Sequence, residues 1–153
     1  MNISEHISLK EALRSNTAKR LGIDNMPDNK TLVTMQETAK YVFEPLRNYF
    51  NEPIYISSFY RSPELNTAIG GSANSQHCKG QAIDIDDVYS KASNADFFNY
   101  IKDNLEFDQL IWEFGNDNNP DWVHCSYASG SNRGNIFRAI KENGKTKYAF
   151  YEL

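Results

Sequence analysis

The order of the periodic segments constrains the fold of this 153-residue chain more than any other feature. Apolar residues recur at three- and four-residue steps from Thr31 to Phe50, which is the stripe of a long amphipathic helix. Short segments with strand character follow later in the chain. This order predicts an α+β fold, with a central, mostly antiparallel sheet and the N-terminal helices packed on it. The length suits a single domain over residues 1–153.

Local signals divide the chain further. Ser8 and Glu11 form a capping box that opens a short helix, and Ser62 followed by Pro63 predicts the start of another. Pro45 removes a backbone hydrogen bond inside the long helix, so it is expected to kink or divide that helix. The other expected elements are a loop from the end of the first helix through Gly22 and Asn29, strands at 54–57, 82–86, 109–112 and 122–126, a helix around 97–105, and a hairpin turning at 143–144.

Charge and hydropathy exclude several functional classes. The net charge of −4 gives no electrostatic footprint for nucleic acid. No stretch approaches the ~18 consecutive apolar residues of a membrane-spanning helix. The N-terminus lacks the basic and apolar regions of a signal peptide, so we expect a protein that is cytoplasmic as synthesised. We also expect it to be a monomer.

Two of the three histidines lie close in sequence to an aspartate. His77 precedes Asp84 by seven positions, and His124 follows much later in a segment with strand character. Two imidazoles and one carboxylate form a typical catalytic zinc set that leaves a coordination position open for water. Asp121, three residues before His124, is a candidate to accept protons. Spacing alone leaves other roles open, because histidine has many structural uses. The same donor set also occurs in non-haem iron oxygenases.

Cys78 and Cys125 each directly follow one of these histidines. Adjacent residues of an extended segment point to opposite faces, so we expect both cysteines to face away from the histidines as small apolar groups. Metal ligation by the cysteines is the alternative. Two cysteines suit a reducing compartment better than a disulfide framework.

Three segments together resemble the zinc D-Ala-D-Ala carboxypeptidase family. The first is Ser57-Ser58-Phe59-Tyr60-Arg61-Ser62-Pro63, the second is Ser75-x-His77-x-x-Gly80-x-Ala82-x-Asp84, and the third is Trp122-Val123-His124-Cys125-Ser126. The similarity runs from about Ser4 to the C-terminal hairpin. This family includes bacterial carboxypeptidases, vancomycin-resistance dipeptidases and phage endolysins, and it has the hedgehog/DD-peptidase fold.

The resemblance implies a role for each matching residue. His77, Asp84 and His124 would bind one zinc ion, and Arg61 would polarise the substrate carbonyl. Ser75 would contact substrate or orient the loop that carries His77. Gly80 would allow a tight turn with positive φ before the strand that carries Asp84.

The catalytic base is where the chain departs from the pattern of many family members. They have Glu three residues before the last histidine, whereas this chain has Asp121. We expect Asp121 to be the general base, with Glu113 as the alternative or as a residue that orients a ligand.

The resemblance implies hydrolysis of a peptide bond in peptidoglycan stem peptides, either D-Ala-D-Ala or L-Ala-D-Glu. Such an enzyme would reach the cell wall on release, as a phage lysin does, or would trim precursors inside the cell. A non-catalytic zinc module of the same fold is the alternative function. The combination of Arg61 and Asp121 argues against that alternative, because neither is needed merely to hold zinc.

Overall fold

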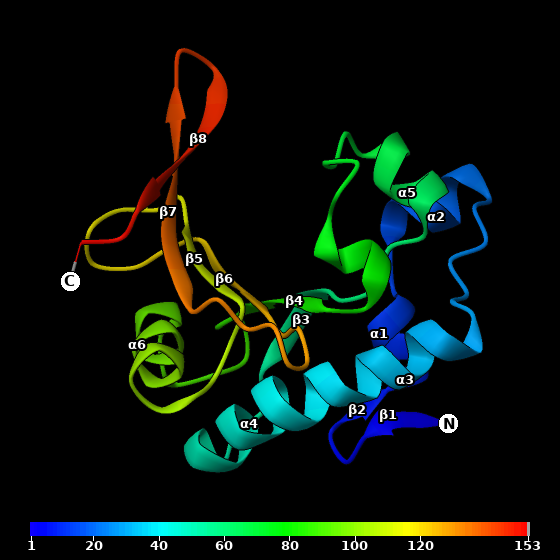
Figure 1. The fold of residues 1–153 in the computed structure, drawn as a ribbon, viewed down its shortest axis with the longest axis horizontal. Coiled ribbons are helices and arrows are strands. Elements are labelled where there is room, and N and C mark those ends of the chain that lie inside the picture. Colours follow the sequence, from blue (N-terminus) through cyan, green and yellow to red (C-terminus); the bar gives the residue numbers. More distant parts are fainter. Residues whose placement is uncertain (153) are drawn as a thin grey trace.

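The computed structural model describes residues 1–152 and has an α+β fold built around a six-stranded mixed sheet (Figure 1). The strand order is β3-β4-β6-β5-β7-β8, and every neighbouring pair is antiparallel except β5 and β7. A separate two-stranded sheet pairs β1 with β2. The strands are β1 (Asn2–Ser4), β2 (Ile7–Ser8), β3 (Tyr55–Ser58), β4 (Ala82–Asp86), β5 (Gln109–Glu113), β6 (Trp122–Ser126), β7 (Asn135–Glu142) and β8 (Lys145–Phe150). The predicted fold class is therefore confirmed.

Most helices of the first two-thirds of the chain begin at a polar N-cap. The helical elements are α1 (Leu9–Leu13), α2 (Asn16–Leu21), α3 (Asn29–Thr38), η1 (Ala39–Phe43), α4 (Glu44–Phe50), α5 (Pro63–Ala68), η2 (Gln76–Lys79) and α6 (Asn94–Asn104). The Ser8 and Ser62 hydroxyls accept hydrogen bonds from the third backbone N–H of α1 and α5, as predicted. The segment expected to be a loop, from the end of α1 through Gly22 to Asn29, contains α2, so that prediction is wrong over residues 16–21. Ser15 caps the start of α2 and Gly22, with φ +66°, ends it.

The long amphipathic helix is interrupted where Pro45 predicts a break. α3, η1 and α4 form one continuous helical run in Figure 1, but η1 is a π-helical turn. Pro45 cannot donate to the carbonyl one turn earlier, and widening the preceding turn accommodates that loss. The apolar stripe survives the interruption, because Met35, Ala39, Val42 and Leu46 are all buried.

The central sheet has two different faces because successive side chains alternate between them. Ile83, Val123 and Trp112 lie on the face that joins the hydrophobic core, where Trp112 packs edge-on against Phe98 of α6. The opposite face carries polar side chains from β4, β5 and β6. The sheet therefore separates a dry face, covered by helices, from a face available to a ligand.

The C-terminal hairpin extends the ligand-facing side of the sheet. Asn143 and Gly144 both have positive φ, 54° and 76°, as a two-residue type I′ turn requires, so this prediction is confirmed. The first half of β7 pairs with β5, and the turn end of the β7–β8 hairpin projects away from the other elements at the top of Figure 1. The residues of β8 are exposed along its whole length.

Candidate metal centre and active-site groove

His77 lies on the short 3₁₀ turn η2 and is buried, with 2% of its surface exposed. The Ser75 hydroxyl accepts a hydrogen bond from the His77 backbone N–H and so caps this turn. His77 Nδ1 lies 2.7 Å from the carbonyl oxygen of Phe59, to which it donates. That hydrogen bond leaves Nε2 as the lone-pair nitrogen, as in a histidine oriented for metal binding.

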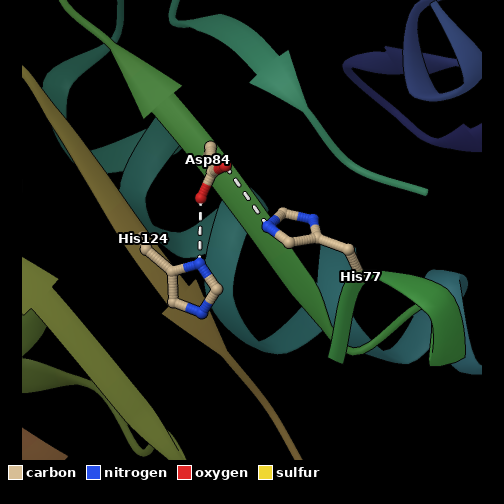
Figure 2. Close-up of side chains that lie close together, drawn as sticks. All are labelled: His77, Asp84 and His124. Carbon is tan, nitrogen blue, oxygen red and sulfur yellow. Dashed lines mark hydrogen bonds and ion pairs between the residues drawn. The ribbon is translucent and has the colours of Figure 1, made fainter. Parts of the chain in front are cut away.

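Asp84 and His124 are brought together by strand pairing. They are direct partners across β4 and β6, and His124 Nδ1 lies 2.9 Å from Asp84 Oδ1. The other carboxylate oxygen, Oδ2, lies 3.2 Å from His77 Nε2 (Figure 2). One ligand atom from each residue falls within 4.8 Å of the other two. Two nitrogens and one carboxylate oxygen converging from η2, β4 and β6 could hold a metal ion and suit tetrahedral zinc.

The electrostatics of this cluster also suit a cation. Burial raises the pKa of Asp84, but the two neighbouring histidines outweigh it and hold that pKa below its ordinary value. Asp84 therefore stays ionised at neutral pH. This partly buried carboxylate lies between two imidazole rings and can exchange its hydrogen bond with His124 for metal coordination.

Gly80 ends η2 in a conformation and a space that only glycine fits. Its φ is +73°, and an added Cβ would lie 2.7 Å from Met35 Cγ and 3.0 Å from the Thr31 carbonyl oxygen. Its own carbonyl accepts a 2.8 Å hydrogen bond from the Thr38 hydroxyl of α3. The turn that positions His77 is therefore packed directly on the long helix.

We expect Gly80→Ala to lower the free energy of unfolding by about 2–4 kcal/mol, because left-handed strain adds to overpacking against α3. Gly22 has a similar φ, +66°, with no atom within 4 Å of an added Cβ. The matched Gly22→Ala variant should cost only about 1–2 kcal/mol, the strain alone. Urea denaturation of both variants measures the difference, and equal losses would show that the contact with α3 is unimportant.

Arg61 and Ser75 lie together on one wall of a groove of about 830 Å³ that contains the three candidate ligands. Arg61 donates a 3.1 Å hydrogen bond from its guanidinium to the Ser75 hydroxyl. The Arg61 backbone N–H also bonds to the His77 carbonyl. Both residues predicted to meet substrate thus line the groove and contact the turn that carries His77.

The two candidate bases occupy different environments. Glu113, on β5, lines the groove and is 6% exposed. Burial raises its pKa to about 7; His124 opposes that shift and Asp84 adds to it. A bound cation would lower this pKa again. Asp121 is exposed, immediately precedes β6, and is absent from the groove lining in the described part of the chain, residues 1–152.

The sheet register explains the difference. Glu113 pairs with Trp122 and Ile111 pairs with His124, so Glu113 and His124 are diagonal neighbours on one face. Asp121 lies at a bend just before β6, and its backbone N–H donates a 2.9 Å hydrogen bond to the Glu113 carbonyl.

Comparison with known protein families decides the class of protein. Residues 5–126 match the family model described as peptidase M15, which is more than three-quarters of the chain. The chain belongs to the peptidase M15 family. It is therefore a zinc-dependent metallopeptidase by family, and its candidate ligands His77, Asp84 and His124 lie within the matched region. A search of curated proteins found no match.

The cysteines of this M15 peptidase lie outside the group of candidate metal ligands in the described residues 1–152. Cys125 is fully buried on the core face of β6, and burial raises the pKa of its thiol. Cys78 is half-buried, and burial raises its pKa too. Its histidine neighbour lies on a 3₁₀ turn rather than in the extended segment we expected. Within residues 1–152, neither thiol belongs to a group of potential metal ligands.

A second group of potential ligands, Glu5, His6 and Glu44, has a simpler explanation. Glu44 accepts hydrogen bonds from the Ser4 hydroxyl, the His6 backbone N–H and the His6 ring, at 2.6, 2.8 and 2.7 Å. These bonds fasten the β1–β2 turn to the start of α4. These three hydrogen bonds give the Glu44 carboxylate a structural role.

Sequence reasoning missed the groove residues that follow the last histidine. Phe137, Lys141, Thr146 and Tyr148 line the groove from the hairpin. Alternate residues of a strand share one face, so the strand pattern of the hairpin could have grouped them. In the structure, Ala139 pairs with Tyr148 and Lys141 pairs with Thr146 on that face. Arg133, in the loop before β7, also lines the groove.

In the part of the chain that the structure describes, residues 1–152, no helix is long and apolar enough to cross a bilayer.

Proposed function

We propose that this chain hydrolyses a peptide bond in peptidoglycan stem peptides, using one zinc ion held by His77, Asp84 and His124. The supporting observation is the convergence of three ligand atoms within 4.8 Å at the floor of a groove that also contains a buried carboxylate, Glu113. Zinc bound there would supply a Lewis acid and a water whose pKa is lowered to about 7. A protein serving only to hold zinc needs neither Glu113 nor Arg61 beside the metal.

We propose Glu113, rather than Asp121, as the general base. Diagonal neighbours across antiparallel strands are separated by roughly 7–8 Å between Cα atoms, which leaves room for a water between the Glu113 carboxylate and the ligand His124. Glu113 then accepts the proton of the attacking water and delivers it to the leaving amine.

Arg61 is proposed to stabilise negative charge on the carbonyl oxygen of the substrate. Its guanidinium is held by Ser75, and its Nε is buried with no hydrogen-bond partner among residues 1–152. A guanidinium stays charged at any working pH and offers donors in a fixed plane. It can therefore meet the developing charge without reorganising.

Arg61→Lys is expected to keep zinc and the fold but to lower kcat by about 10²–10³-fold, the scale for losing one oxyanion donor. Lysine retains the charge but not the planar geometry, so the variant tests positioning rather than net charge. Steady-state kinetics on a synthetic stem peptide provide both constants. If only KM rises, Arg61 contributes uniform binding and the oxyanion role is wrong.

The family includes enzymes for two different bonds, so the product identifies the activity. Incubating the zinc-loaded protein with a synthetic stem pentapeptide ending in D-Ala-D-Ala separates the alternatives. Release of free D-Ala would identify a carboxypeptidase. Fragments split between L-Ala and D-Glu would identify an endopeptidase of the endolysin type. An intact peptide would contradict the proposed function.

A further inference from the structure

The charged groups that line the groove divide sharply by sign. The acids are Asp84 and Glu113, both at the proposed catalytic centre, and the remaining charged side chains of the described groove are Arg61, Arg133 and Lys141. This arrangement contrasts with the net charge of −4 for the whole chain. The three cations of this groove favour an anionic substrate.

Arg133 is the most firmly positioned of the cations outside the matched region. Its Nε and one terminal nitrogen donate to Asp108 at 2.9 and 2.8 Å. Its backbone N–H also donates to Asp108, at 2.9 Å. Asp108 is 2% exposed, and the hydrogen bonds from Arg133 hold the pKa of Asp108 down at about 2. The side chain of Arg133 nevertheless remains 55% exposed.

The geometry leaves part of the guanidinium free for a ligand. A guanidinium carries five N–H donors, and Asp108 occupies one edge of it. Arg133 lines the groove, and its other terminal nitrogen has no hydrogen bond to residues 1–152. Because the side chain is already fixed, little conformational freedom is lost when a second carboxylate binds.

The surroundings of Arg133 connect it to the catalytic turn. Gln76, the neighbour of the ligand His77, donates a 2.9 Å hydrogen bond to Asp108. Ser75, the preceding residue, accepts from Arg61. Arg61 therefore bonds directly to Ser75, whereas Arg133 is connected to the adjacent residue, Gln76, through Asp108. Gln76 Oε1 is buried without a hydrogen-bond partner among residues 1–152.

We propose that Arg133 binds a carboxylate of the peptide substrate and makes the enzyme select acidic stem peptides over amidated ones. The proposal rests on the proposed peptidase function. A carboxylate accepts two hydrogen bonds from a guanidinium, whereas a carboxamide offers one oxygen and no charge. Arg133 is thus a specificity-determining residue, and its loss should remove a preference rather than the reaction.

The test compares peptide pairs. kcat/KM is measured on a stem peptide with free carboxylates and on versions in which each carboxylate in turn is a carboxamide. Wild-type protein should prefer the free acid at one position by about 10–100-fold, the scale of a hydrogen bond to a charged group. Arg133→Gln should reduce that preference to nearly one. Asp108 keeps its bonds to Gln76 and to the backbone of residue 133, so the fold should survive.

Arg138→Gln is the matched control. Arg138 also pairs with an aspartate, Asp117. It lies on the face of β7 that points away from the groove, over the ring of Trp112. This variant should keep the wild-type preference for the free acid. If Arg133→Gln does not fold, Arg133→Lys preserves the cation and should show a reduced preference with a raised KM.

Three results would overturn the assignment. They are a wild-type enzyme indifferent to amidation, an Arg133→Gln variant that keeps the preference, and an equal loss of activity on acid and amide. The last would mean that Arg133 only supports the fold around Asp108. Failure of the wild type to cleave any stem peptide would instead contradict the proposed function itself.

Discussion

Replacing Glu113 by Gln is expected to lower kcat by about 10²–10⁴-fold while the bound zinc stays at the wild-type level. Gln has nearly the same shape as Glu but cannot accept a proton, so the variant removes the base and leaves the groove intact. Glu113 lies beside the ligands without belonging to the cluster of ligand atoms. Steady-state kinetics and elemental analysis on the same preparation measure the two quantities separately.

Asp121→Asn is the matched control for that experiment, because it makes the same chemical change on an exposed carboxylate eight residues away in the chain. It should leave both zinc content and kcat near the wild-type values. An inactive Asp121→Asn variant together with an active Glu113→Gln variant would assign the base to Asp121 instead.

His124→Ala is expected to lose both the zinc and all measurable peptidase activity. Removing one of three protein ligands leaves only His77 and Asp84 to hold the ion, and the bound ion supplies the chemistry. Zinc should also no longer raise the melting temperature, because a ligand stabilises the fold only where it binds. Elemental analysis and thermal denaturation with and without added zinc measure these effects.

The third histidine of the chain provides the control. His6 is bonded to Glu44 at the junction of the β1–β2 turn and α4. His6→Ala should therefore retain one zinc per chain and wild-type turnover. Loss of zinc from His6→Ala, or its retention in His124→Ala, would show that the metal is held elsewhere.

Features of the fold that depend on neighbouring residues could be predicted from the sequence. The caps at Ser8 and Ser62 and the turn at Asn143–Gly144 each rest on a few adjacent side chains, and all three are confirmed. α2 was missed although it has the same kind of signal, with Ser15 at its start and Gly22 at its end. Its short apolar pattern gave no helical period to support those caps.

Pairings between distant segments could not be predicted in the same way. β5 runs parallel to β7, with Gln109 opposite Asn135, and no local signal specifies that pairing. It brings the hairpin against the strand that carries Glu113. The hairpin wall of the groove therefore follows from the topology of the sheet.

The candidate site also contains residues that the sequence could indicate and one whose environment it could not. The family motif contains His77, Asp84 and His124, so resemblance could indicate them together. The environment of Glu113 becomes visible only when β5 pairs with β6, because burial of that carboxylate depends on both strands. The sequence favours Asp121 because it occupies the position of the family's Glu, three residues before His124, but that position alone does not show whether its side chain reaches the candidate ligands.

The most direct test of this account is mass spectrometry of purified peptidoglycan digested with the zinc-loaded protein. We expect stem peptides cut at one defined peptide bond, D-Ala-D-Ala or L-Ala-D-Glu. The products should be absent when His124→Ala replaces the wild type or when zinc is removed by a chelator. Stem peptides that remain intact in the presence of folded protein with one zinc per chain would contradict the proposal that this metal centre hydrolyses peptidoglycan.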